Sequence, residues 1–161
     1  MNPYQSKAPL LSKERERELL SFTKDNNLHF NNLRLLNLAF THTSYANEHK
    51  GAVDNNERLE FLGDSVLSLI TSEYIFDKFS DSPEGYLTKV RAAVVCSKSL
   101  AIFANKINLG AYMLLGKGEE ENGRTNPKIL ENAFEALLAA IYLDSNHSKD
   151  IVAKFLLPIM E

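Results

Sequence analysis

Residues 56–75 (NERLEFLGDSVLSLITSEYI) constrain the fold more than any other stretch of the chain. Their apolar residues recur at the spacing of one helix face, which predicts a long helix that packs along one side. Glu57, Glu60 and Asp64 stand at i, i+3 and i+7. They therefore fall within about 60° of one another around this helix. The predicted apolar stripe contains Leu59, Leu62, Val66, Leu69 and Ile70.

Two features of this acidic helix would lower its stability if it stood alone. Glu60 and Asp64 form a like-charge i, i+4 pair, which destabilises a helix by about 0.2–0.5 kcal/mol. No Lys or Arg stands between Arg58 and Lys78 to offset them. Gly63 costs about 1 kcal/mol relative to Ala in a helix interior, so we expect another backbone to approach it closely. Three acids alone are equally compatible with a solvated helix face, because charged residues are usually exposed.

A second helical pattern, at residues 128–143 (KILENAFEALLAAIYL), changes that balance. Asn132 and Glu135 stand at i and i+3 and face the same way. Glu135 is the only charged residue between Ala133 and Asp144. A lone carboxylate on so apolar a helix is costly unless a cation meets it. Two helices that each offer carboxylates from an apolar face therefore predict a site for a hard divalent cation.

The ligand types indicate which cation and which chemistry. Oxygen ligands alone favour Mg²⁺ or Mn²⁺ over zinc. Such a site hydrolyses phosphodiesters by activating water and stabilising the leaving oxygen. A di-iron helix bundle would need Glu-x-x-His on two helices, and the sequence has no such motif. His42 has no partner His or Cys at metal spacing, so a structural role is favoured for it.

Length and composition predict one globular domain over residues 1–161, with residues 1–11 as a loose leader. No apolar run reaches membrane-spanning length, and the N-terminus does not resemble a signal peptide. The single cysteine, Cys96, stands in an apolar run, so we expect it to be buried and the compartment to be reducing. The net charge of −3 argues against nucleic acid as a partner unless carboxylates recruit cations.

The remaining patterns are helical, and no alternating run is long enough for a sheet. We therefore expect an all-α fold with one core and about seven helices. Ser12, Ser82-Pro83 and Asn126-Pro127 are typical helix starts, and an Asn should cap the central helix. The apolar side chains of residues 84–95 should face the core. Further helices are expected at residues 14–24, 33–40, 84–95, 97–107 and 148–160, with an exposed loop at 116–125.

Residues 57–65 (ERLEFLGDS) resemble the signature of the ribonuclease III family without a gap. The resemblance covers about residue 28 to the C-terminus. It continues in the family's order through residues 42–48 (HTSYANE), 84–85 with 91–92, 115–120 (LGKGEE) and 129–144.

The resemblance implies a ribonuclease III-like helical endonuclease domain that forms a two-fold homodimer. It implies cleavage of double-stranded RNA with Mg²⁺, for which Mn²⁺ can substitute, and products with 5′-phosphates and short 3′ overhangs. Processing of rRNA and mRNA precursors in the cytoplasm belongs to the same expectation.

Individual residues match the family's functional positions. Glu60 and Glu135 are similar to its metal ligands, and Asp64 to the residue that works with Glu135 in activating the attacking water. Glu57 is similar to an outer acid near the valley that holds the RNA. Phe61 is similar to an aromatic knob that enters a socket on the other subunit. From the residue type alone, Phe61 is as well explained as an ordinary core residue.

The chain departs from the family's pattern in two ways. Asn132 stands where the family usually has Asp, as a third metal ligand. An amide oxygen can bind Mg²⁺ but carries no charge, so we expect weaker metal binding with the fold intact. Some eukaryotic members resemble this chain in carrying Asn there, and whether this Asn is natural or engineered stays open. The sequence also lacks the double-stranded-RNA-binding domain into which bacterial members usually continue.

Two functions remain in competition at this point. One is a metal-dependent endoribonuclease, favoured by Glu57, Glu60, Asp64 and Glu135. The other is a weakened or inactive domain that binds RNA or a ribonucleoprotein partner without cutting, and only Asn132 favours it. The natural RNA and its cleavage positions leave no trace in the sequence.

Overall fold

The structure is a computed structural model that describes residues 10–161. It is helical throughout, and the only β-type pairing in this range is an isolated bridge between Thr41 and Leu114. The expected all-α fold is confirmed. The α-helices are α1 (Lys13–Asp25), α2 (Leu33–Ala39), α3 (Thr43–Glu48), α4 (Glu57–Lys78), α5 (Glu84–Val94), α6 (Ser97–Lys106), α7 (Pro127–Asp144) and α8 (Lys149–Met160). Two 3₁₀ turns, η1 (Leu109–Tyr112) and η2 (Gly123–Thr125), lie between α6 and α7.

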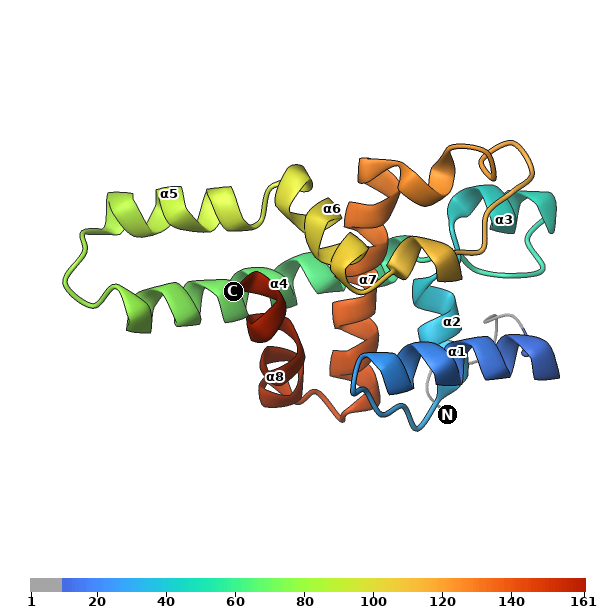
Figure 1. Cartoon of the computed structure of the whole chain (residues 1–161), viewed down its shortest axis with the longest axis horizontal. Coiled ribbons are helices and arrows are strands. Elements are labelled where there is room, and N and C mark those ends of the chain that lie inside the picture. The colour runs from blue at the N-terminus through green and yellow to red at the C-terminus, as the bar shows by residue number, and fades with distance from the viewer. Residues whose placement is uncertain (1–9) are drawn as a thin grey trace.

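Helix α7 is the centre of the core. Its residues from Ala133 to Ile141 are all buried, and α2, α4, α6 and α8 pack around it. Figure 1 shows α7 running through the middle of the body, with α4 crossing it. The start of α7 is the predicted one, because the Asn126 side chain accepts hydrogen bonds from the backbone N–H groups of Lys128 and Ile129. Pro127 then opens the helix.

The second half of α4 and the whole of α5 project from the body as a hairpin (Figure 1). Helix α5 has no fully buried residue, so the expectation that its apolar side chains face the core holds only at its end, where Val94 and the adjacent Val95 pack half-buried against the core. The physical reason is that α5 packs only on α4 and α6, so each apolar residue has cover on one side alone. On α4, Leu69 and Phe76 are 58% and 68% exposed. The predicted apolar stripe therefore holds for Leu59, Val66 and Ile70, with Leu62 half-buried, but it is wrong for Leu69.

The structure differs from the sequence-based predictions at two places, the segment after α2 and the residue Cys96. Residues 43–48 form the short helix α3 instead of ending α2, and His42 caps it by accepting a hydrogen bond from the Ser44 N–H at 3.2 Å. This is the structural role favoured for His42. Cys96 is exposed at the start of α6, so the prediction of a buried cysteine is wrong. The apolar run around it lies on the thin α5–α6 junction rather than in the core.

Two predicted caps also differ in detail. Pro83, not Ser82, is the N-cap of α5, and no side chain bonds to that helix end. At α4, Asn55 accepts a hydrogen bond from the Glu57 N–H at 2.9 Å. Asn56, the formal N-cap, is buried and donates its side-chain N–H to the carbonyl of Ala39 instead. The expected cap at Ser12 is confirmed, and the structure adds a cap at Ser148, whose side chain accepts a hydrogen bond from the Ile151 N–H.

The leader expected over residues 1–11 lies mostly outside the described part of the chain. The loop at 116–125 is exposed over most of its length, as expected, but Gly123 is buried in η2. Within residues 10–161, no helix combines the length and the apolar character that a membrane crossing requires.

Candidate active site

An acidic pocket of about 500 Å³ opens where the first turns of α4 meet the first half of α7. Helix α4 contributes the three acids whose shared face the sequence predicts, and α7 contributes two further carboxylates and one ammonium group. The pocket is lined by Glu57, Glu60, Phe61, Asp64, Lys128, Glu131 and Glu135.

The two helices approach each other closely at Gly63. A Cβ built on Gly63 would lie 1.7 Å from the carbonyl oxygen of Glu135 and 3.2 Å from its Cα. The predicted close backbone approach is therefore confirmed, and the neighbouring backbone is that of α7. Because Asp64 follows Gly63 directly, this contact holds Asp64 and Glu135 at the same pocket.

Glu135 is the most unusual group in the pocket. Its residue is only 7% exposed, and within residues 10–161 no side chain or backbone group forms a hydrogen bond or ion pair with its carboxylate. The pKa of Glu135 is raised from 4.5 to about 8. Burial is the largest cause, and the negative charges of Asp64, Glu131 and Glu60 contribute the rest. A buried carboxylate without a donor is a costly arrangement in a folded protein, which is why a cation would stabilise it.

Glu60 is affected in the same direction. Burial is the largest cause that raises the pKa of Glu60, and Glu57, Glu131 and Asp64 add repulsion. Lys128 acts against this, because its positive charge favours the ionised forms of Glu60 and Glu135. The Lys128 ammonium lies 3.2 Å from Glu131 Oε2, and this hydrogen bond raises the pKa of Lys128.

The positions of Asn132 and Glu131 relative to the acidic pocket differ from what the sequence predicts. Asn132 does not line the acidic pocket, although its Oδ1 is shielded from solvent and accepts no hydrogen bond. Glu131, which the sequence reasoning did not select, does line it. Its spacing from Glu135 is i, i+4, the strongest same-face relationship on a helix, and this signal could have found it.

Phe61 projects outward beside the acids and is 81% exposed. The interpretation of Phe61 as a core residue is therefore wrong. A shallow depression of about 400 Å³ adjoins it and is lined by residues 57–59 with Phe61 and Leu62. A large aromatic side chain in this position is available for contact with another molecule.

The donor set of the acidic pocket fits a hard divalent cation. It consists of carboxylate oxygens, which Mg²⁺ and Mn²⁺ prefer. Nearby, the Oδ1 of Asn132 is a buried oxygen without a hydrogen-bond partner. The Glu135 residue is 7% exposed and lines the same pocket as the other carboxylates. Within residues 10–161, however, no three His, Cys, Asp or Glu side chains already converge as a metal cage.

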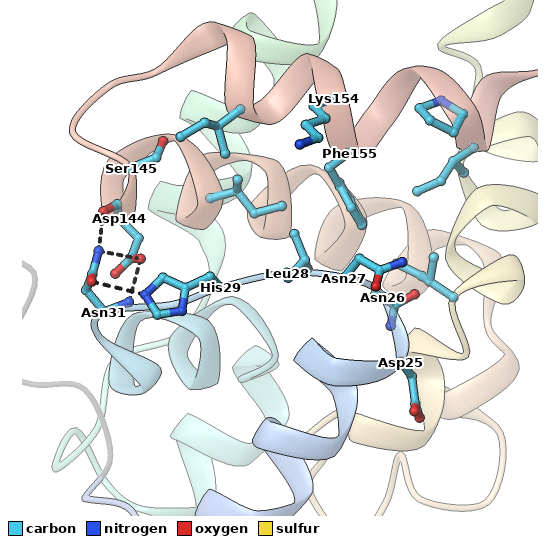
Figure 2. A pocket seen from close by; sticks show the side chains of 15 residues that line it. Asp25, Asn26, Asn27, Leu28, His29, Asn31, Asp144, Ser145, Lys154 and Phe155 are labelled. Atoms are coloured by element: carbon cyan, nitrogen blue, oxygen red, sulfur yellow. Dashed lines mark hydrogen bonds between the residues drawn. The ribbon is translucent and has the colours of Figure 1, made fainter.

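A larger cavity, of about 620 Å³, lies elsewhere (Figure 2). It is bounded by α8, the end of α7 and the segment between α1 and α2. Its carboxylate Asp144 is already committed, because it accepts the backbone N–H groups of Asn31 at 2.8 Å and Asn32 at 2.9 Å. This cavity joins helix ends and contains none of the acids of α4, so we place the chemistry at the smaller acidic pocket.

The family model and the curated relatives that match this chain all name ribonuclease III or a ribonuclease-III-like family. A family model described as ribonuclease-III-like matches residues 32–160. Ribonuclease 3 of Treponema denticola is 46% identical over 152 residues, which cover 94% of this chain and 61% of that protein. Ribonuclease 3 of Staphylococcus saprophyticus is 55% identical over 120 residues, covering 73% of this chain and 49% of that protein. The chain thus spans roughly half the length of the curated relatives it matches.

Solved structures agree with the sequence relatives. The nuclease domain of ribonuclease III from Campylobacter jejuni superposes with a TM-score of 0.79 at 40% identity, covering 87% of this chain and 94% of that one. The description of that structure concerns flexibility in the region involved in dimer formation. Dicer from Pichia stipitis superposes with a TM-score of 0.60 at 28% identity, over 83% of this chain and 57% of that one.

Proposed function

Because the chain belongs to the ribonuclease III-like family, we propose that it is a metal-dependent endoribonuclease that hydrolyses phosphodiester bonds of double-stranded RNA. The family is metal-dependent in general, and hydrolysis of this kind is the chemistry that carboxylate-bound cations perform. The observation that carries the proposal is the buried carboxylate of Glu135, without a hydrogen bond, in one pocket with Glu60 and Asp64.

We assign Mg²⁺ as the cofactor, with Mn²⁺ as a substitute, and Glu60 and Glu135 as its carboxylate ligands. Asn132 is the neutral third ligand of this assignment, and its partnerless Oδ1 supports that role. A bound cation would stabilise the charge that develops on the phosphate and would make an attacking water more acidic. Asp64, beside Glu135 in the pocket, is the group that takes the proton of this water together with Glu135.

The proposed binding partners are double-stranded RNA and a second copy of the chain. Glu57 is exposed at the edge of the pocket and serves as the outer acid on the side where RNA enters. Phe61 and the projecting α4–α5 hairpin offer apolar surface to the partner of a two-fold homodimer. The substrates are rRNA and mRNA precursors with products bearing 5′-phosphates and short 3′ overhangs. The proposal places this activity in the cytoplasm.

A second candidate function is an RNA-binding domain of this family that does not cut. The observation in its favour is the neutral amide of Asn132, which does not line the acidic pocket. The remaining acids oppose it, because a protein that never binds a cation gains nothing from the repulsion among Glu60, Asp64 and Glu135.

The deciding experiment is a cleavage assay of the whole chain on long double-stranded RNA with Mg²⁺ or Mn²⁺, with EDTA as the metal-free control. We expect short products bearing 5′-phosphates, and no cleavage in EDTA or by Glu135→Gln, which should still bind the RNA in a filter or gel-shift assay. Binding without cleavage by the parent chain at every metal concentration would establish the second candidate.

A further inference from the structure

We propose that Glu131 supplies the metal site with the negative charge that Asn132 lacks. This inference rests on the metal-dependent activity proposed above and names a residue that this activity did not require. The acidic pocket receives two carboxylates from α7, those of Glu131 and Glu135, and no atom of Asn132 lines it. On the α7 side of the site, the carboxylate that accompanies Glu135 therefore comes from position 131 and not from position 132.

The placement of Glu131 is specific. Its side chain is only 12% exposed, although it lies on the first half of a helix whose outer face is open to solvent. It is one helical turn from Glu135, so the two carboxylates lie on the same face of α7. The charge of Glu131 also acts on both Glu60 and Glu135, which places it within electrostatic reach of both helices.

Hydrogen bonds hold one oxygen of Glu131 and leave the other open. The Ser97 hydroxyl at the start of α6 donates to Glu131 Oε2 at 2.6 Å, and the Lys128 ammonium donates to the same atom at 3.2 Å. Within the described residues both of these bonds go to Oε2, and none goes to Glu131 Oε1. Ser97 and Lys128 thus fix the orientation of the carboxylate while Oε1 remains available to a cation.

The neighbouring Glu135 provides an independent reason to expect a cation here. The Glu135 residue is more than nine-tenths buried and lines the same pocket, and no group within residues 10–161 donates a hydrogen bond to its carboxylate. Lys128 is the only cationic side chain that lines this pocket within the described residues, and it faces Glu57, Glu60, Asp64, Glu131 and Glu135 there. One ammonium group leaves a strong excess of negative charge, and hard cations bind more tightly as the ligand charge rises.

A purely structural role for Glu131 must be separated from this proposal. Glu131 could simply tie α7 to α6 through Ser97. The variant Ser97→Ala removes that tie and keeps the charge, whereas Glu131→Gln removes the charge and keeps a hydrogen-bonding side chain of the same length. Glu121→Gln, in the exposed loop before α7, makes the same change of net charge away from the pocket.

The test is calorimetric titration of Mn²⁺ into the whole chain without RNA, with circular dichroism to confirm that each variant is folded. We expect Glu131→Gln to weaken Mn²⁺ binding roughly tenfold, in line with the charge dependence of hard-cation sites. Glu121→Gln should stay within about twofold of the parent. Ser97→Ala loosens the Glu131 carboxylate but keeps its charge, so it should lose clearly less affinity than Glu131→Gln. Adding Asn132→Asp to Glu131→Gln should restore most of the affinity.

A second comparison protects the test against a poorly folded variant. If Glu131 already supplies the charge, Asn132→Asp should raise the Mn²⁺ affinity of the parent by less than it raises that of Glu131→Gln. Equal gains in the two backgrounds, or an unchanged affinity in Glu131→Gln, would overturn the role of Glu131 and leave the proposed nuclease function intact. A parent chain that binds no Mn²⁺ would overturn the metal-dependent function itself.

Discussion

The backbone of Gly63 lies against the carbonyl of Glu135 so closely that a Cβ on Gly63 would stand 1.7 Å from that oxygen. Any residue with a Cβ would clash here, so only glycine fits this contact. The consequence is that α4 and α7 meet at the level of their acids, with Asp64 and Glu135 in one pocket. A residue that carries no chemistry therefore sets the separation on which the chemistry depends.

Gly63→Ala should destabilise the protein and separate the helices. Forcing extra volume into a packed contact costs about 1–3 kcal/mol and more against rigid backbone, and for a chain of this size each kcal/mol lowers Tm by roughly 2–4 °C. Thermal unfolding would measure this. Gly85→Ala is the matched control, because it also lies in a helix but a Cβ there meets nothing within 4 Å. Equal stability of both variants would contradict the contact.

Divalent metal should stabilise the folded chain. A cation that binds only the folded state at about 100 times its Kd adds about 2.7 kcal/mol, which corresponds to a rise in Tm of roughly 5–10 °C at this chain length. The rise should disappear in Glu135→Ala, which removes the buried carboxylate. A Tm that is indifferent to millimolar Mg²⁺ and Mn²⁺ would argue against a folded metal site.

Without metal, stability should fall as pH rises from about 4.5 to about 8. The pKa of Glu135 is raised from 4.5 to about 8 in the folded state, so across this window the folded chain holds a proton that the unfolded chain has released. Stability therefore decreases with pH, by at most about 1.4 kcal/mol per pH unit. Glu60, whose pKa is also raised, acts in the same direction.

Urea unfolding in EDTA at a series of pH values would measure this dependence. The informative quantity is the difference between the parent and Glu135→Gln, because other groups titrate alike in both. His42, for example, has a pKa lowered by burial and contributes an opposite slope below its ordinary value. Identical pH profiles for parent and variant would show that Glu135 is ionised in the folded chain at neutral pH.

Phe61→Ala should weaken the homodimer without lowering the stability of the isolated fold. Phe61 is 81% exposed, so its removal leaves no cavity in the core. Central aromatic residues of an interface commonly contribute 2 kcal/mol or more, about a thirtyfold change in Kd. Sedimentation analysis would measure it, with Leu20→Ala on α1 as a control for loss of an exposed apolar side chain. A parent chain that stays monomeric at micromolar concentration would refute the dimer.

Asn132→Asp should raise both metal affinity and the rate of RNA cleavage, most visibly at low Mg²⁺. The substitution converts an amide oxygen that has no hydrogen-bond partner into a charged ligand, one helical turn from Glu135. Cleavage rates across a Mg²⁺ titration would test it. An unchanged metal dependence would mean that position 132 stays outside the site in solution.

Local patterns predicted the elements that matter most. The Asn126-Pro127 start of α7, the Ser12 cap of α1 and the long helix around Glu60 all follow from interactions within a few residues. Such interactions are present in the sequence wherever the chain later folds. The pairing of two acidic helices followed for a similar reason, since a lone charge on an apolar helix has few stable environments.

Other features depended on neighbours that no local pattern reveals. Leu69 follows the apolar spacing of α4 but is 58% exposed, whereas the adjacent Ile70 is 2% exposed, so Leu69 lies on the side of the helix that the core does not cover. Cys96 belongs to an apolar run yet is exposed, because it lies at the junction between α5 and α6, where it is the N-cap of α6. The exposure of Phe61 could not be decided from its type, since an apolar residue on a helix can face a core or a partner.

The sequence by itself determined the helical class, the two acid-bearing helices and the family, because periodicity and an ungapped signature are properties of the chain. Tertiary structure decided which residues share the pocket. Asn132 and Glu131 are neighbours in sequence and both stand within a turn of Glu135, so spacing alone supports either. The rotation of α7 against α4, fixed where Gly63 meets the Glu135 carbonyl, brings Glu131 into the pocket lining and leaves Asn132 outside it.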